Sequence, residues 1–193
     1  MKQTSYVAQA GMIAALYATA TVIALLFLQG LAWGPVQFRI SEALTVVALL
    51  TRAAIPGLTI GCVIANVVAL VINGTGALGL LDVAFGALAT FLAALWCYHF
   101  RDREGIALLG PVIMNALIVP AYLPILLQGL GFYTIPFTAI DLDGAYWAMY
   151  LFGFVATGIG EAIVMYCLGL PLLRAIKKHG GNDWDVLDVR PKA

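Results

Sequence analysis

Six polar side chains lie in stretches of sequence that are otherwise apolar, and their chemistry needs an explanation. They are Arg39, Glu42, Asn66, Asp82, Asn115 and Glu161. An ionisable group at membrane depth is costly to keep, so each charged member of this set is a candidate functional residue. Together, the carboxylates, the guanidinium and the amides could line a cavity and recognise a flat, polar solute through hydrogen bonds.

Five of these residues also have a purely structural interpretation. Arg39 and Glu42 are three positions apart, and an ion pair between them could fix a helix end. Asp82 could cap the helix that begins there. Asn66 and Asn115 fall near the middles of two apolar segments, where amides often tie neighbouring helices together. Both interpretations stay open for these five residues.

Glu161 is harder to explain structurally. A carboxylate so deep in an apolar segment needs a partner, and Gly158 and Gly160 leave room beside it for a neighbouring helix or a ligand. It could bind solute, carry protons in a secondary transporter, or have a structural or coupling role. Trp33, Gln37 and Tyr133 lie in the loops between apolar segments. They could form an aromatic lid over a planar ligand or anchor the chain at the membrane interface.

Motifs for other chemistry are absent from the sequence. There is no P-loop, HExxH or GxSxG, and no GxGxxG after a strand, so we expect neither an enzyme nor a bound cofactor. Cys62, Cys97 and Cys167 lie inside apolar segments without metal-ligand spacing, and we expect buried thiols rather than a metal site. The net charge is zero, which gives no electrostatic reason to expect nucleic-acid binding.

The composition indicates an all-α integral membrane protein. Of the 193 residues 63% are hydrophobic and only 10% are charged, more apolar than a soluble domain of this size. We expect a six-helix transmembrane domain over residues 1–179 and a flexible cytoplasmic tail over 180–193. The first span follows Lys2 and is too long for a cleavable signal, so we expect it to stay in the membrane. The expected spans are 7–28, 40–51, 54–73, 82–100, 105–127 and 146–173. The second, short span could instead be a broken or partly re-entrant segment.

The positions of lysine and arginine predict the orientation. If the N-terminus is cytoplasmic, nine of the ten basic residues fall on the cytoplasmic side and only Arg39 does not. We therefore expect both ends inside. Ala10, Ala14 and Ala18 repeat every four residues along the first span, with Gly11 and Ala15 beside them. Small side chains let helices approach closely, either within this bundle or at a partner protein.

Four short blocks resemble the QueT family of membrane proteins. They are residues 33–44 (WGPVQFRISEAL), 61–66 (GCVIAN), 82–86 (DVAFG) and 160–162 (GEA). The QueT family comprises substrate-binding S-components of energy-coupling factor transporters, assigned to the uptake of queuosine precursors in the bacterial plasma membrane. The resemblance extends over nearly the whole chain, from the alanine stripe to the sixth span.

The resemblance implies a six-helix S-component with both ends inside and its solute site in the outer half. It also implies partners: a transmembrane coupling protein (EcfT type), docked on Ala10, Ala14 and Ala18, and two cytoplasmic ATPases. For a deazaguanine solute, we expect Glu42 or Asp82 to accept hydrogen bonds from its donor edge. Its carbonyl would meet Gln37, Arg39 or Asn115, its ring would stack on Trp33 or Tyr133, and an aminomethyl group would favour Glu161.

Three other functions stay open at this point. The chain could be an S-component for another vitamin or nucleobase, because the pocket and not the fold decides the solute. It could be a secondary transporter or channel that works without ATPases, with Glu161 as its proton site. A membrane-embedded enzyme is the third, and the missing catalytic motifs argue against it.

Overall fold

The computed structural model describes residues 3–28, 39–127, 142 and 144–179, and all regular structure in these residues is helical. Five helical stretches in this part of the chain are long and apolar enough to span a membrane. The elements in order are α1 (Gln3–Phe27), η1 (Ile40–Leu49), α3 (Ala54–Asn73), η2 (Gly76–Leu78), α4 (Gly79–Leu81), η3 (Asp82–Gly86), α5 (Ala87–His99), α6 (Glu104–Leu127), α7 (Tyr146–Ile163), η4 (Val164–Gly169) and α8 (Leu170–His179).

The sequence predicted five spans well and the second one poorly. The span over 54–73 is confirmed, and the span expected at 82–100 begins earlier, at Gly76. The last span continues to His179 and not only to residue 173. The second expected span is η1, a 3₁₀ helix of ten residues. At about 2 Å per residue it covers about 20 Å, or about two thirds of a hydrocarbon core. These ten residues alone are therefore too short for a full span. The proposed tail over 180–193 lies outside the described residues.

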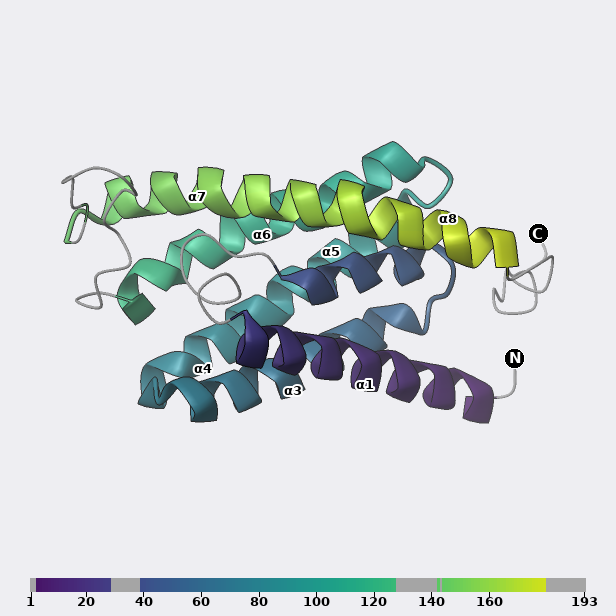
Figure 1. Cartoon of the computed structure of the whole chain (residues 1–193), viewed down its shortest axis with the longest axis horizontal. Coiled ribbons are helices and arrows are strands. Elements are labelled where there is room, and N and C mark those ends of the chain that lie inside the picture. Colours follow the sequence, from purple (N-terminus) through teal and green to yellow (C-terminus); the bar gives the residue numbers. More distant parts are fainter. Residues whose placement is uncertain (1–2, 29–38, 128–141, 143, 180–193) are drawn as a thin grey trace.

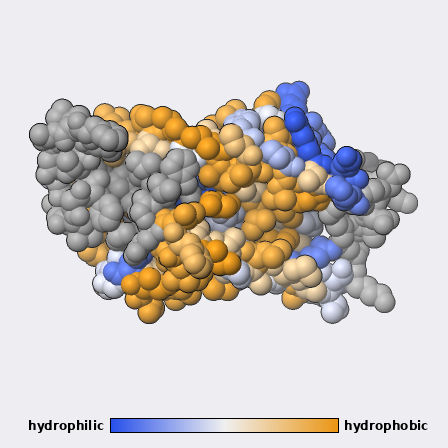
Figure 2. Space-filling view, viewed as in Figure 1, coloured by the Kyte–Doolittle hydropathy of each residue, from blue (hydrophilic) through white to orange (hydrophobic). Residues whose placement is uncertain are grey.

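The helices form one elongated bundle in which α1 begins and α8 ends at the same end (Figure 1). The turns that precede α3 and α6 lie at this end as well, and an ion pair of 2.7 Å between Lys177 and Glu104 joins α8 to α6 there. Hydrophilic residues gather at this end in Figure 2, next to a broad hydrophobic band. We call it the basic end, because the turns before α3 and α6 contain Arg52 and Arg101, and the last turn of α8 contains Lys177. That it faces the cytoplasm stays a prediction.

The surface of the bundle is apolar, as expected for a protein surrounded by lipid. Large hydrophobic side chains such as Met12, Phe27, Val71 and Trp147 are more than half exposed. Cys62 and Cys97 are buried free thiols, as expected, but the same expectation is wrong for Cys167, which is a free thiol on the exposed side of η4.

Helices α1 and α3 pack through a seam of small residues. Ideal Cβ atoms built on Gly57 and Gly61 would lie 2.8 Å from the carbonyl oxygens of Ala10 and Ala14, so only glycine fits there. Ala10, Ala14 and Ala18 are all buried in the chain. In this structure α3 covers Ala10 and Ala14, so these residues pack inside the bundle, and docking of a partner on the alanine stripe stays a prediction.

A second row of small residues on α1 is exposed. Ala8, Gly11 and Ala15 lie on the outer side of the helix, and a Cβ built on Gly11 would meet no atom within 4 Å. Helix α1 therefore has small residues on two faces, one used inside the bundle and one uncovered in this structure.

Candidate functional site

Glu42 lies at the centre of a buried polar cluster between the helices. Its side chain is fully buried on η1. The Tyr17 hydroxyl donates to Glu42 Oε1 at 2.5 Å, and the Thr90 hydroxyl donates to the same oxygen at 3.0 Å. Thr45, one 3₁₀ turn further along η1, donates to Oε2 at 3.0 Å. Three donors from α1, α5 and η1 hold this carboxylate in one orientation.

Asp82 forms the second half of the cluster. Its Oδ1 accepts a hydrogen bond from Arg39 Nη2 at 3.0 Å and another from the Tyr122 hydroxyl at 2.5 Å. The Arg39–Asp82 pair joins residues 43 positions apart, whereas the structural interpretation left open from the sequence paired Arg39 with its neighbour Glu42. The capping interpretation of Asp82 is wrong, because the helical run begins six residues earlier, at Gly76.

The backbone around Asp82 is a π-helix, η3, and this local geometry is part of the site. π-Helical turns are rare and often occur at functional positions. Asn66 Nδ2 donates to the Asp82 carbonyl oxygen at 2.7 Å, which confirms that this amide ties two helices together. A Cβ built on Gly86 would lie 2.7 Å from Asn66 Nδ2 and 3.1 Å from Asp82 Oδ1. Glycine at position 86 is what lets the amide reach this carbonyl.

Cys62 links the two halves of the cluster. Its sulfur lies 3.4 Å from Thr90 Oγ1, which belongs to the Glu42 half, and 3.5 Å from Asn66 Nδ2, which belongs to the Asp82 half. A continuous polar network therefore crosses the bundle interior from α1 to α6. Satisfied networks of this kind hold their members in fixed positions.

Asn115 and Glu161 are buried without any hydrogen-bond partner among the described residues. Asn115 on α6 is fully buried and Glu161 on α7 is 1% exposed, and both polar atoms of each side chain are unpaired. Both side chains lie in the buried interior of the bundle, as the polar cluster does. Since buried polar atoms in proteins are almost always paired, these four atoms are candidates for contact with a bound molecule.

The chemistry of this interior suits a small polar solute. Three carboxylates (Glu42, Asp82 and Glu161) and one guanidinium (Arg39) supply strong acceptors and a strong donor, and the Asn115 amide supplies both kinds of group. The carboxylates outnumber the cation, which favours a solute with several N–H groups or a positive charge. Among the described residues no cluster of side chains is suited to a metal ion.

Trp33, Gln37 and Tyr133 lie outside the described residues. The sequence analysis missed four residues of the cluster: Tyr17, Thr45, Thr90 and Tyr122. Thr45 had a detectable signal, because it follows Glu42 by three positions. The other three look like ordinary residues of apolar helices until the fold brings their hydroxyls to a carboxylate.

Comparisons with known proteins agree with the resemblance noted in the sequence. A family model described as QueT transporter matches residues 7–178, which is most of the chain. No curated protein and no solved structure matches the chain.

Proposed function

The chain belongs to the QueT transporter family and so has a membrane transport role, and from this premise we propose that it is the substrate-binding subunit through which a queuosine precursor is taken up. The proposed solute is a deazaguanine, bound inside the bundle by the buried polar cluster. The protein would be a multi-pass protein of the bacterial plasma membrane with six membrane segments, the short η1 included, and with the basic end in the cytoplasm. It would deliver the solute inward with a coupling protein and two ATPases.

The observation that carries this proposal is that Asn115 and Glu161 are buried without a hydrogen-bond partner among the described residues. A deazaguanine has a carbonyl next to N–H donors on its Watson–Crick edge. Glu42 or Asp82 can accept from these donors, and Arg39 or Asn115 can donate to the carbonyl. Gln37 is a further donor proposed from the sequence. The ring would stack on Trp33 or Tyr133.

A cationic substituent on the solute would explain Glu161. A carboxylate that is buried without a described partner is stabilised when a positive charge arrives, because a charge-assisted hydrogen bond contributes about 1.5–3 kcal/mol. We therefore propose that an aminomethyl group of the solute meets Glu161 on α7.

Calorimetric binding to the purified protein tests the solute. The probes are an aminomethyl deazaguanine, its uncharged methyl counterpart, guanine and a panel of vitamins. We expect the aminomethyl compound to bind best, and we expect Glu161→Gln to reduce its advantage over the methyl compound by about tenfold or more. Glu104→Gln, at the surface of α6, is the matched control and should leave binding unchanged. If a vitamin binds tightly and no deazaguanine binds, the vitamin replaces the deazaguanine as the proposed solute.

Substitutions on α1, followed by co-purification, test the proposed partners. We propose that the coupling protein docks on the exposed row Ala8, Gly11 and Ala15, because Ala10 and Ala14 are covered by α3. Ala15→Leu should then abolish co-purification with the coupling protein and ATPases while solute binding persists. Ala14→Leu should instead weaken the fold itself. If purified protein in vesicles takes up solute without ATP or partners, a secondary transporter with Glu161 as proton site replaces the proposal.

A further inference from the structure

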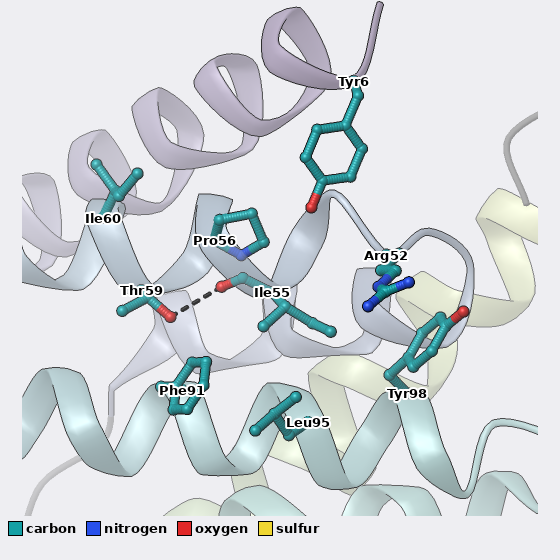
Figure 3. A pocket seen from close by; sticks show the side chains of 9 residues that line it. All are labelled: Tyr6, Arg52, Ile55, Pro56, Thr59, Ile60, Phe91, Leu95 and Tyr98. Carbon is teal, nitrogen blue, oxygen red and sulfur yellow. Dashed lines mark hydrogen bonds between the residues drawn. The ribbon is translucent and has the colours of Figure 1, made fainter. Parts of the chain in front are cut away.

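A groove on the outer surface of the bundle, outside the polar cluster, joins α1, α3 and α5 near the basic end. Its volume is about 540 Å³. Figure 3 shows Tyr6 from α1, Arg52 from the turn before α3, and Tyr98 from α5 at one end of it, and Phe91 and Leu95 along one wall. We call it the Arg52 groove. We propose that it binds an anionic phospholipid, with the phosphate at Arg52 and an acyl chain along α3 and α5.

The polar end of the Arg52 groove is suited to a phosphate. Arg52 is exposed, and its side chain makes no hydrogen bond or ion pair with any other described residue. It lies just before the start of α3, whose first turn contains no acidic residue, so the positive end of the helix dipole adds to its charge. Arg101 lies over the Tyr98 ring at 4.6 Å, which brings a second positive charge to this end of the groove.

The rest of the Arg52 groove is apolar. Its floor and walls are formed by Ile55, Pro56, Ile60, Phe91 and Leu95. Thr59 adds no free hydroxyl to the floor, because its Oγ1 donates to the Ile55 carbonyl at 2.8 Å (Figure 3). Phe91 precedes Tyr98 by seven positions on α5, so the apolar wall runs about 10 Å along the helix from the polar end. A charged head beside an apolar trough matches the two parts of a lipid.

Two other surface grooves of this structure lack the polar end. One lies between α6 and α7 around Leu117 and Phe154, and the other lies around Phe85 and Ile125. Neither is lined by a charged residue. These two grooves suit any acyl chain, whereas the Arg52 groove distinguishes lipids by head-group charge. Anionic lipids gain about 1 kcal/mol for each basic residue at the membrane surface.

Native mass spectrometry of the purified full chain tests this assignment. Protein extracted in mild detergent is mixed with phosphatidylglycerol or with phosphatidylcholine that carries the same acyl chains. We expect the wild-type protein to retain one phosphatidylglycerol and about fivefold less phosphatidylcholine. Arg52→Gln should lower this preference, because only the charge of Arg101 then remains at this end of the groove. Arg103→Gln, an exposed arginine at the same end that does not line the groove, should keep it.

A second variant tests the apolar half of the Arg52 groove. Leu95 is 38% exposed, so Leu95→Trp should fill the trough without disturbing the core and should lower retention of both lipids. Solute binding by each variant shows whether it is folded. Equal retention of phosphatidylglycerol by wild type and Arg52→Gln would overturn the proposal. So would a wild-type protein that retains no lipid but captures the coupling protein only while Arg52 is present, since the groove would then be a protein interface.

Discussion

Asn115→Leu should make the ligand-free protein more stable and its ligand binding weaker. Asn115 is fully buried on α6, and neither its Oδ1 nor its Nδ2 has a partner among the described residues. An unsatisfied buried polar group costs about 1–3 kcal/mol, and an apolar side chain of similar shape removes this cost. For a chain of this size each kcal/mol raises Tm by about 2–4 °C, so a rise of about 2–12 °C is expected.

The same substitution should remove hydrogen bonds to the solute. Two lost bonds of about 0.5–1.5 kcal/mol each weaken binding by about 5- to 150-fold. Thermal unfolding of the purified protein, measured with and without the aminomethyl deazaguanine, gives both quantities. The Tm of the wild-type protein should rise when solute is added. The Tm of Asn115→Leu should be higher than that of wild type without solute, and it should rise little when solute is added.

Asn66→Leu is the matched control, because Asn66 is also buried but is already paired. It donates to the Asp82 carbonyl at 2.7 Å. Its replacement leaves this buried oxygen without its donor and should lower Tm. If Asn115→Leu also lowers Tm and leaves solute binding unchanged, then Asn115 is a structural residue and the unpaired amide does not mark the binding site.

Two further predictions concern glycines at close contacts, where substitution by alanine adds a methyl group. Gly86→Ala should push Asn66 away from Asp82 and weaken solute binding, because the new Cβ would lie 2.7 Å from Asn66 Nδ2. Calorimetry measures this loss of binding. Gly105→Ala is the control and should leave solute binding unchanged, because there is open space around Gly105. Gly61→Ala should lower the free energy of unfolding by about 1–3 kcal/mol, because its Cβ would meet the Ala14 carbonyl oxygen at 2.8 Å. Gly11→Ala, where the new methyl group meets open space, should instead raise the free energy of unfolding by about 0.5–1 kcal/mol. Equal effects of Gly61→Ala and Gly11→Ala in chemical denaturation would contradict the close packing between α1 and α3.

The membrane spans could be predicted from the sequence because hydropathy depends on composition and length alone. η1 could not be predicted in the same way. Its ten residues are apolar enough for a span, but the choice between an α-helix and a 3₁₀ helix depends on the contacts of η1 with α1, α5 and η4. A related limit applies to α1: a repeat of small residues identifies a close-packing face, but only the fold shows that α3 covers Ala10 and Ala14.

The polar residues of the site were predicted better than their partners. Arg39, Glu42 and Asp82 are recognisable because charges are rare inside apolar segments. Sequence spacing left open a pair between Arg39 and Glu42, whereas the fold brings Asp82 to Arg39 across 43 positions. Tyr17 gave no signal, because a tyrosine is common in an apolar helix and its hydroxyl gains a role only beside a carboxylate.

The tight seam between α1 and α3 has a mechanical consequence. With backbone against backbone, neither helix can slide along the other without a collision, so both must shift as a single rigid unit. A Cβ on Gly61 would lie 2.9 Å from the Tyr17 Cβ, and the hydroxyl of Tyr17 donates a hydrogen bond to Glu42. Tyr17 therefore connects the seam between α1 and α3 directly to the Glu42 carboxylate inside the bundle.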